Sequence, residues 1–148
     1  MTLTLCKSAK FTRSRLVIGG ESWQRISSPE EMKAFVRRHF EDFVNKQRAE
    51  VIRENMAPDF LDHNGPGNRE VGIAEDEQMM RAMYERMPGI KVMIEDMVAE
   101  DDKVVCRNVW RWKDEAGNVM QFRGFVEWRF DGDKIAERWA TVTNPEPP

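Results

Sequence analysis

Cysteine and histidine are scarce in this sequence, with two of each among its 148 residues. Two cysteines, Cys6 and Cys106, are too few for the disulfide framework of a small secreted protein, and they favour a reducing, cytoplasmic setting. The histidines and cysteines lack the spacing of a metal site, and the sequence contains neither a glycine-rich phosphate loop nor a Gly-x-Ser-x-Gly elbow. We therefore expect no metal and no cofactor, and any reaction should be cofactor-free proton transfer.

Long apolar runs and a large net charge are also missing. No segment approaches the ~20 apolar residues of a membrane span, and a net charge of -3 argues against nucleic acid as the main partner. Residues 1–20 carry basic side chains and no acid. We interpret residues 1–27 as a basic, flexible N-terminal segment, either a tail, an upstream extension or a targeting peptide. Residues 28–143 are predicted to form one domain, followed by a proline-rich tail over 144–148.

Helical periodicity dominates the first half of the domain. Ser28 has the features of an N-cap, with Pro29 at the first helical position and Glu31 placed to close a capping box, which predicts a helix to about Gln47 or Arg48. His39 falls in its apolar stripe, either as a histidine with one nitrogen bonded or solvated, or as a ligand-contacting group. Further helices are predicted over 49–56 and 72–87, and the methionines of the latter suit an adaptable core or a pocket wall.

From Ile90 onward, apolar and polar residues alternate with the period of strands, over about 90–100, 103–113, 118–130 and 135–143. Helices followed by antiparallel strands are typical of an α+β domain with helices on one face of a curved sheet. If Phe130 faces Ile135 across the turn, Glu137 lies on the apolar side opposite Trp128. Asp96 interrupts the apolar side of its strand, which a bulge, a strand end or a site would explain.

The predicted register between the two central strands pairs Trp112 with Met120, Trp110 with Phe122 and Asn108 with Gly124. This arrangement gathers tryptophans and a few polar groups on the concave side of the sheet. The opposite side carries arginines among apolar residues, and we interpret it as either a solvated surface or a dimer interface.

Three segments give the sequence a family resemblance when they are taken in order. After a helical hairpin come Asp59-Phe60-Leu61-Asp62-His63, then the strand 94–105, and finally the hairpin 130–139. Over about residues 30–143 the sequence resembles the SnoaL-like polyketide cyclases of the nuclear transport factor 2-like superfamily. The resemblance implies a cone, in which N-terminal helices pack on a strongly curved antiparallel sheet that encloses a pocket, and it implies frequent homodimers.

The resemblance is incomplete at the positions that carry the family's chemistry. In the SnoaL-like cyclases an acidic residue a few positions after Glu-x-Trp acts as the acid and base, and Thr143 occupies that position here. The family's glycine and histidine pattern is replaced by residues 110–114. Aldol cyclisation by the family mechanism is therefore not implied by these residues.

The candidate site combines proton-transfer groups with a pocket lining. His63 is the first choice for proton transfer unless it is a solvated loop residue, and Glu137 would have a raised pKa unless an arginine makes it a structural ion pair. Asp59 would orient His63 or cap a turn, and Asn108 would stabilise an oxyanion or satisfy a buried neighbour. The predicted substrate-binding residues are Tyr84, Asn108, Trp110, Phe122, Trp128, Trp139, Thr141 and Thr143.

Two functions follow from this site. The first is an enzyme that binds a small apolar molecule, cyclic or polyketide-like, and catalyses cofactor-free cyclisation, isomerisation or dehydration. The second is a non-catalytic ligand-binding or accessory protein. Either would form a homodimer through the outer sheet face, with a small hydrophobic molecule as partner.

Overall fold

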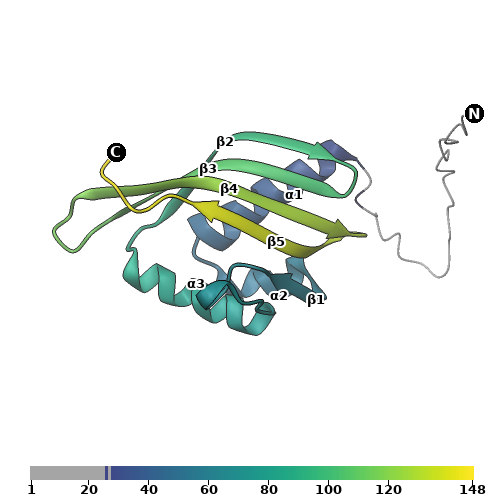
Figure 1. Ribbon diagram of the computed structural model, residues 1–148, viewed down its shortest axis with the longest axis horizontal. Coiled ribbons are helices and arrows are strands. Elements are labelled where there is room, and N and C mark those ends of the chain that lie inside the picture. The colour runs from purple at the N-terminus through teal and green to yellow at the C-terminus, as the bar shows by residue number, and fades with distance from the viewer. Residues whose placement is uncertain (1–25, 27) are drawn as a thin grey trace, which may run out of the picture.

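The computed structural model describes residue 26 and residues 28–148, so the predicted basic segment lies outside the described residues except for Ile26. Figure 1 shows helices packed against a curved sheet. In the described part of the chain the α-helices are α1 (Pro29–Phe40), α2 (Ile52–Asn55) and α3 (Ile73–Arg86), and the strands are β1 (Met56–Asp62), β2 (Lys91–Glu100), β3 (Lys103–Lys113), β4 (Val119–Asp131) and β5 (Lys134–Val142).

The predicted capping box starts α1. The Ser28 hydroxyl accepts a hydrogen bond from the Glu31 backbone N–H at 3.2 Å, and the Glu31 carboxylate accepts one from the Ser28 N–H at 3.1 Å. The predicted long helix then changes character, because Glu41–Asn45 form a π-helical turn, η1, in which the Lys46 N–H donates to the Glu41 carbonyl at 2.9 Å. Such wide turns often occur at functional sites.

The predicted helix over 49–56 is shorter than expected. A 3-10 turn, η2 (Ala49–Val51), precedes α2, and Met56 already belongs to strand β1. Pro58 accounts for the early end, since proline cannot donate within a helix and forces the residue before it toward extended geometry.

The sheet has the order β1-β5-β4-β3-β2, and β1 runs parallel to β5 while the other neighbours are antiparallel. The predicted register between β3 and β4 is confirmed, including the pair Asn108 and Gly124. Gly124 is required there, because a Cβ atom on it would lie 2.2 Å from the Thr141 carbonyl oxygen. The sheet is mixed, a small departure from the all-antiparallel prediction.

A bulge in β5 overturns one prediction. Phe130 does face Ile135, but Arg129 faces Glu137, so Ala136 is an extra residue between the two pairs. Because one inserted residue exchanges the two faces of a strand, Glu137 lies on the outer face and Arg138, opposite Trp128, lies on the concave face. The prediction that Glu137 faces Trp128 is therefore wrong.

A second bulge lies in β2, between Ile94 and Asp96, as one of the predicted explanations of Asp96 requires. Beyond it Met97 is buried in the core, and Val98 is 61% exposed on the outer face. Alternation counted straight on from Ile94 predicts Val98 on the apolar side of this strand, and the bulge makes that prediction wrong.

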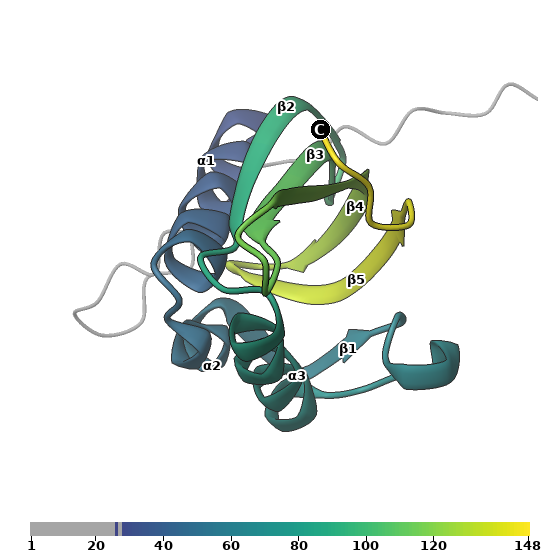
Figure 2. The same cartoon turned by 90° about the vertical axis from the view of Figure 1, so that its left-hand side faces the viewer.

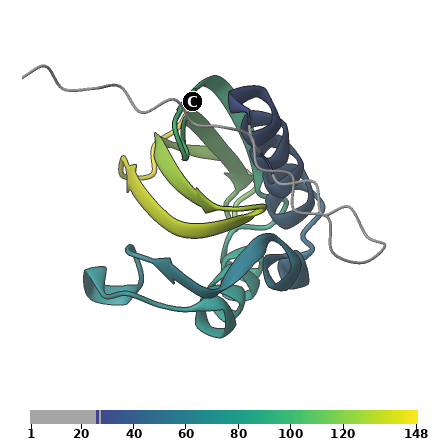
Figure 3. The same cartoon turned by 90° about the vertical axis from the view of Figure 1, so that its right-hand side faces the viewer.

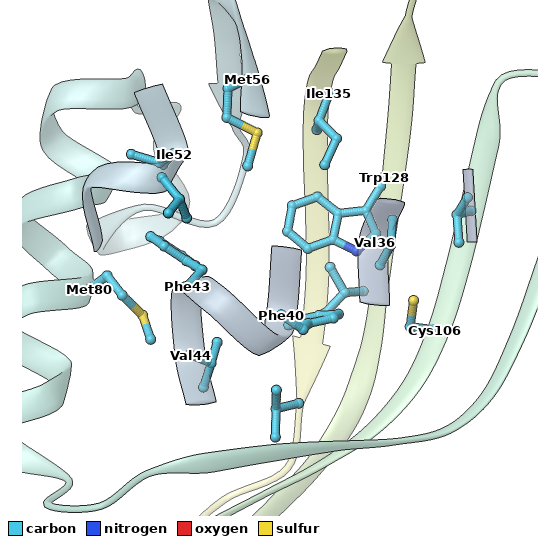
Figure 4. Close-up of a cluster of buried hydrophobic side chains, with 14 of the residues drawn as sticks. Val36, Phe40, Phe43, Val44, Ile52, Met56, Met80, Cys106, Trp128 and Ile135 are labelled. Atoms are coloured by element: carbon cyan, nitrogen blue, oxygen red, sulfur yellow. The ribbon is translucent and has the colours of Figure 1, made fainter. Parts of the chain in front are cut away.

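The core lies between α1 and the concave face of the sheet. Figure 2 shows the sheet curling with α1 along one side and α2, α3 and β1 beneath it, and Figure 3 shows the same layers from the opposite end. Val36 and Phe40 of α1 pack near Trp128 and Cys106 of the sheet, with Phe43 beside them (Figure 4). None of the helices in the described part of the chain is long and apolar enough to cross a membrane.

Candidate active-site cavity

A cavity of about 560 Å³ lies between the concave face of the sheet, the end of α1 with η1, and α3. Its size suits a small organic molecule, since ligand pockets of proteins span roughly 300–1,000 Å³. Most of the wall is apolar, with Trp110, Phe122 and Trp128 from the sheet and methionines from α3. A smaller set of polar residues shares this lining: His39, Asp62, Asn64, Asn68, Asp76, Arg138 and Thr141.

Asp62 and Arg138 form a buried ion pair in this wall. An Arg138 guanidinium nitrogen lies 2.7 Å from Asp62 Oδ2, and Asp62 Oδ1 accepts the Asn64 backbone N–H at 2.9 Å. The Arg138 guanidinium also lies over the Trp128 ring, 5.7 Å from its centroid. Arg138 reaches this place only because of the β5 bulge, and Asp62 because β1 ends beside β5. The pair fixes one cation and one anion beside an apolar cavity.

Asp76 is a second buried acidic group in the wall. It belongs to the first turn of α3, is 8% exposed, and lacks a hydrogen-bond donor to its carboxylate among the described residues. Burial raises the pKa of Asp76 to about 6, and the charge of Asp62 adds to the rise while Arg138 opposes it. A carboxyl group with this pKa exchanges protons readily near neutral pH.

His39 is almost completely buried, with 1% of its surface exposed. The Asn55 side-chain amide donates to His39 Nδ1 at 3.0 Å, and the imidazole stacks on Phe43 with ring centroids 4.9 Å apart. Burial lowers the pKa of His39 to about 3, and the positive charge of Arg138 contributes to this. His39 Nε2 has no hydrogen-bond partner among the described residues. The imidazole is thus neutral, and only one of its two ring nitrogens has a hydrogen-bond partner among the described residues.

The two residues first chosen for proton transfer do meet, but on the outer face of the sheet. His63 Nε2 lies 3.2 Å from Glu137 Oε1, and the His63 ring stacks on Trp139 with centroids 4.5 Å apart. Arg129 donates to Glu137 and holds the pKa of that carboxyl below its usual value, with His63 contributing. The predicted rise in the pKa of Glu137 is wrong, and its alternative, an ion pair with arginine, describes the structure.

The remaining predicted residues divide between the cavity and its surroundings. Trp110, Phe122, Trp128 and Thr141 line the cavity, and their contact with a ligand stays a prediction. Tyr84 donates its hydroxyl proton to the Phe43 carbonyl, and its pKa is raised by burial.

Four other predicted residues do not line this cavity. Asp59 is exposed on β1, Thr143 bonds to the backbone of Arg123, and Trp139 lies on the outer face. Asn108 is fully buried, and neither polar atom of its amide has a partner in residue 26 or residues 28–148.

Asp76 and Arg138 were not among the site residues predicted from the sequence. The apolar stripe of α3 contained a signal for Asp76, because this acid lies three residues after Ile73 and four before Met80, on the buried face. No comparable signal marked Arg138, since its side of the strand depends on the bulge. Within the described part of the chain, no group of three or more acidic, histidine or cysteine side chains is arranged to hold a metal ion.

A groove of about 620 Å³ lies outside this cavity, between the start of β2 and the β3–β4 hairpin. Its lining includes Lys91, Arg111 and Lys113 but no acid or histidine, so it offers no pair of groups for proton transfer at neutral pH. We therefore place the candidate site in the interior cavity.

Comparison with known proteins agrees with this architecture. The family model for SnoaL-like polyketide cyclase matches residues 34–144. No protein with a curated description matches the sequence significantly.

Solved structures share the fold at low sequence identity. AclR from Streptomyces galilaeus, a proposed hydroxylase, has a TM-score of 0.70 and 20% identity, with 78% of this chain and 91% of that chain covered. IdmH from Streptomyces antibioticus, a proposed polyketide cyclase, has a TM-score of 0.69 and 19% identity, with 76% and 91% covered. A proposed polyketide cyclase from Acidithiobacillus ferrooxidans has a TM-score of 0.68 and 18% identity, with 80% and 91% covered. At these identities the likeness shows the fold alone.

Proposed function

Because this chain belongs to the SnoaL-like polyketide cyclase family, we propose that it binds a small, largely apolar carbonyl compound in the interior cavity and catalyses a cofactor-free acid–base reaction on it. Cyclisation, isomerisation and dehydration all belong to this class. We assign the proton transfer to Asp76. The proposal replaces His63 and Glu137 in that role, because their contact lies on the outer face of the sheet.

The single observation that carries the proposal is the state of Asp76. A carboxyl group with a pKa of about 6 is largely ionised at neutral pH, yet it is basic enough to take a proton from carbon beside a carbonyl group. The apolar wall that raises the pKa of Asp76 would also hold the substrate. Burial in this wall would therefore both bind the substrate and make Asp76 more basic.

The proposed reaction needs no reactant besides the substrate and the Asp76 carboxylate. The Asp76 carboxylate takes a proton from the carbon next to the substrate carbonyl, which leaves a neutral carboxylic acid and an enolate. In isomerisation the acid returns its proton to another carbon of the enolate. In cyclisation the enolate carbon attacks a second carbonyl carbon, and the resulting alkoxide takes the proton from Asp76. Either route restores the carboxylate.

Arg138 and Asp62 have supporting roles in this proposal. Arg138 lies close enough to oppose the rise in the pKa of Asp76, and its pairing with Asp62 fixes where that positive charge lies. As the enolate forms, negative charge moves from Asp76 to the substrate oxygen, and the nearby guanidinium stabilises charge at both places.

A ligand-binding protein without catalysis is the second candidate function. Thr143 supports it, because this residue occupies the family's acidic position and its hydroxyl is used by the Arg123 backbone N–H at 3.1 Å. In that case the cavity would bind the same class of compound and leave it unchanged.

Proton exchange from 2-tetralone separates the two functions without knowledge of the natural substrate. This bicyclic ketone is small enough for the cavity, and loss of its C1 proton signal in D₂O reports proton removal beside a carbonyl group. We expect wild-type protein to accelerate the exchange and Asp76→Asn to lose that acceleration.

Glu77→Gln is the matched control, since Glu77 is the adjacent acid in α3 but pairs with Arg53 and Arg81 instead of lining the cavity. This variant should exchange 2-tetralone at the wild-type rate. Binding of 2-tetralone without acceleration would contradict the enzymatic proposal and support the ligand-binding function. Equal loss in both variants would contradict the assignment to Asp76.

We also infer a homodimer formed through the outer face of the sheet. Met93, Val98 and Phe125 are 46%, 61% and 54% exposed, and their strand partners place all three on this face. Arginines 107 and 123 pair with Glu95 between them. A face that combines exposed apolar side chains with charges of both signs can complement a second copy of itself.

A further inference from the structure

We infer that His39 is a fixed, neutral hydrogen-bond donor that selects ligands carrying an acceptor oxygen, such as a carbonyl or enolate oxygen, at the α1 side of the cavity. The inference rests on the proposed function for the location of the ligand, and it adds a specificity-determining group that the proton transfer itself does not require. Four observations support it: the tautomer of the His39 imidazole, its neutral charge, the lack of a partner for Nε2 among the described residues, and the packing that holds the ring in place.

The tautomer is set by Asn55. The amide nitrogen of Asn55 is a donor only, and it lies 3.0 Å from His39 Nδ1, so Nδ1 must be the accepting nitrogen. In a neutral imidazole the proton then belongs to Nε2. The contact with Asn55 therefore converts the other end of the ring into an N–H donor.

The charge of this donor does not change over the pH range in which proteins work. The pKa of His39 is lowered to about 3, first by burial and then by the positive charge of Arg138, while Asp42 opposes the shift. A group that is neutral throughout this range donates one hydrogen bond from Nε2 at every relevant pH. It would therefore recognise an acceptor oxygen and would not attract an anion by charge.

The donor has no partner in the protein. His39 is 1% exposed and is one of the residues that line the cavity, and no group in the described residues accepts a hydrogen bond from Nε2. Buried donors in folded proteins are almost always satisfied. An acceptor atom of a ligand in the cavity would satisfy this one.

The ring is held in place on two sides. Its face stacks on Phe43, with centroids 4.9 Å apart and planes at 22°, and it meets Trp128 edge to face at 5.3 Å. Phe43 is placed by the π-helical turn η1, which continues α1 one residue after Phe40. An immobile donor loses little entropy when it bonds a ligand, so it discriminates well between an oxygen and an isosteric carbon.

Paired probes test this inference through binding alone. The ketone 2-acetylnaphthalene and the hydrocarbon 2-isopropenylnaphthalene have nearly the same shape, but only the ketone has an acceptor oxygen. Calorimetric titration of the wild-type protein should give a dissociation constant at least about tenfold lower for the ketone, which corresponds to ~1.4 kcal/mol. The double variant His39→Phe/Asn55→Leu keeps an aromatic ring, removes the Asn55 amide that would lose its partner, and should lower that ratio to about one.

A nitrogen NMR spectrum of the wild-type protein provides the second measurement, which does not depend on whether a variant folds. We expect a neutral imidazole protonated on Nε2 from pH 5 to pH 8, with a change in the Nε2 shift when the ketone is added and none with the hydrocarbon. A proton on Nδ1, an affinity ratio of one in the wild-type protein, or a ratio unchanged in the double variant would overturn the inference. Neither measurement involves turnover. Selective binding of the ketone can therefore be observed even if 2-tetralone exchange is not accelerated, and acceleration can be observed even if binding is not selective.

Discussion

Replacing Asp76 by asparagine should stabilise the protein by an amount that grows as the pH rises. The pKa of Asp76 is 3.8 for an ordinary aspartate and about 6 in the folded protein. A carboxyl group whose pKa is raised on folding contributes its full stability below the unfolded value, and this contribution is lost as the pH rises through the folded value. A rise of roughly two units corresponds to about 3 kcal/mol, at 1.36 kcal/mol for each unit.

Asparagine resembles the neutral acid in size and polarity and does not ionise. The free energy of unfolding of Asp76→Asn should therefore exceed that of the wild type by about 2.4 kcal/mol more at pH 7 than at pH 4, with most of the change between pH 4 and pH 6, because a small part of the ~3 kcal/mol is already lost at pH 4. Urea denaturation followed by circular dichroism at pH 4, 5, 6, 7 and 8 measures both proteins in the same buffers. A difference that stays constant over this range would show that the pKa of Asp76 is not raised in the folded protein.

The matched control is Glu77→Gln, for which the sign is opposite. Arg81 and then Arg53 hold the pKa of Glu77 below its usual value through hydrogen bonds. An acid with a lowered pKa contributes stability above its unfolded pKa and loses it as the pH falls. Glu77→Gln should therefore be less stable than the wild type at pH 7, and the deficit should shrink in acid.

Three further predictions concern packing, charge and assembly. Gly124→Ala should lower the free energy of unfolding by about 1–3 kcal/mol, measured by urea denaturation, because its Cβ atom would collide with the Thr141 carbonyl; an unchanged value would contradict the close approach. Arg138→Met should lower the free energy of unfolding by about 3–5 kcal/mol, because it leaves buried Asp62 without its partner. Carbon NMR of this variant should show a further rise in the pKa of Asp76, and a fall would contradict the effect assigned to the Arg138 charge. Phe125→Asp should convert the dimer to a folded monomer in analytical ultracentrifugation, whereas a monomeric wild type would refute the proposed interface.

The elements with long, regular patterns could be predicted from the sequence. Strands β3 and β4 alternate without interruption, so both their bounds and the pairing of Trp110 with Phe122 followed from period two. The capping box at Ser28 is a local signal and was equally accessible. The α+β class and the family resemblance followed from the order of these elements.

The candidate site could not be predicted because it depends on an irregularity. The bulge at Ala136 inserts an apolar residue after apolar Ile135, which the alternation pattern does not mark as extra. Counting straight through it exchanged Glu137 and Arg138 between the two faces of the sheet. The stripe of α3 indicates that Asp76 faces inward, but the size of its pKa shift could not be predicted, because it depends on burial in the folded protein and on Arg138 and Asp62, which are distant in the sequence.

In the proposed function, the Asp76 carboxylate removes protons from a carbonyl compound in the interior cavity. The rate of 2-tetralone exchange by the wild-type protein, measured from pH 4.5 to pH 8 after subtraction of the buffer-catalysed rate, tests this step without any variant. We expect a rate that rises with an apparent pKa near 6 and then levels, because the ionised carboxylate is the base. A protein-dependent rate that is flat across this range, or that rises only above pH 7, would contradict it.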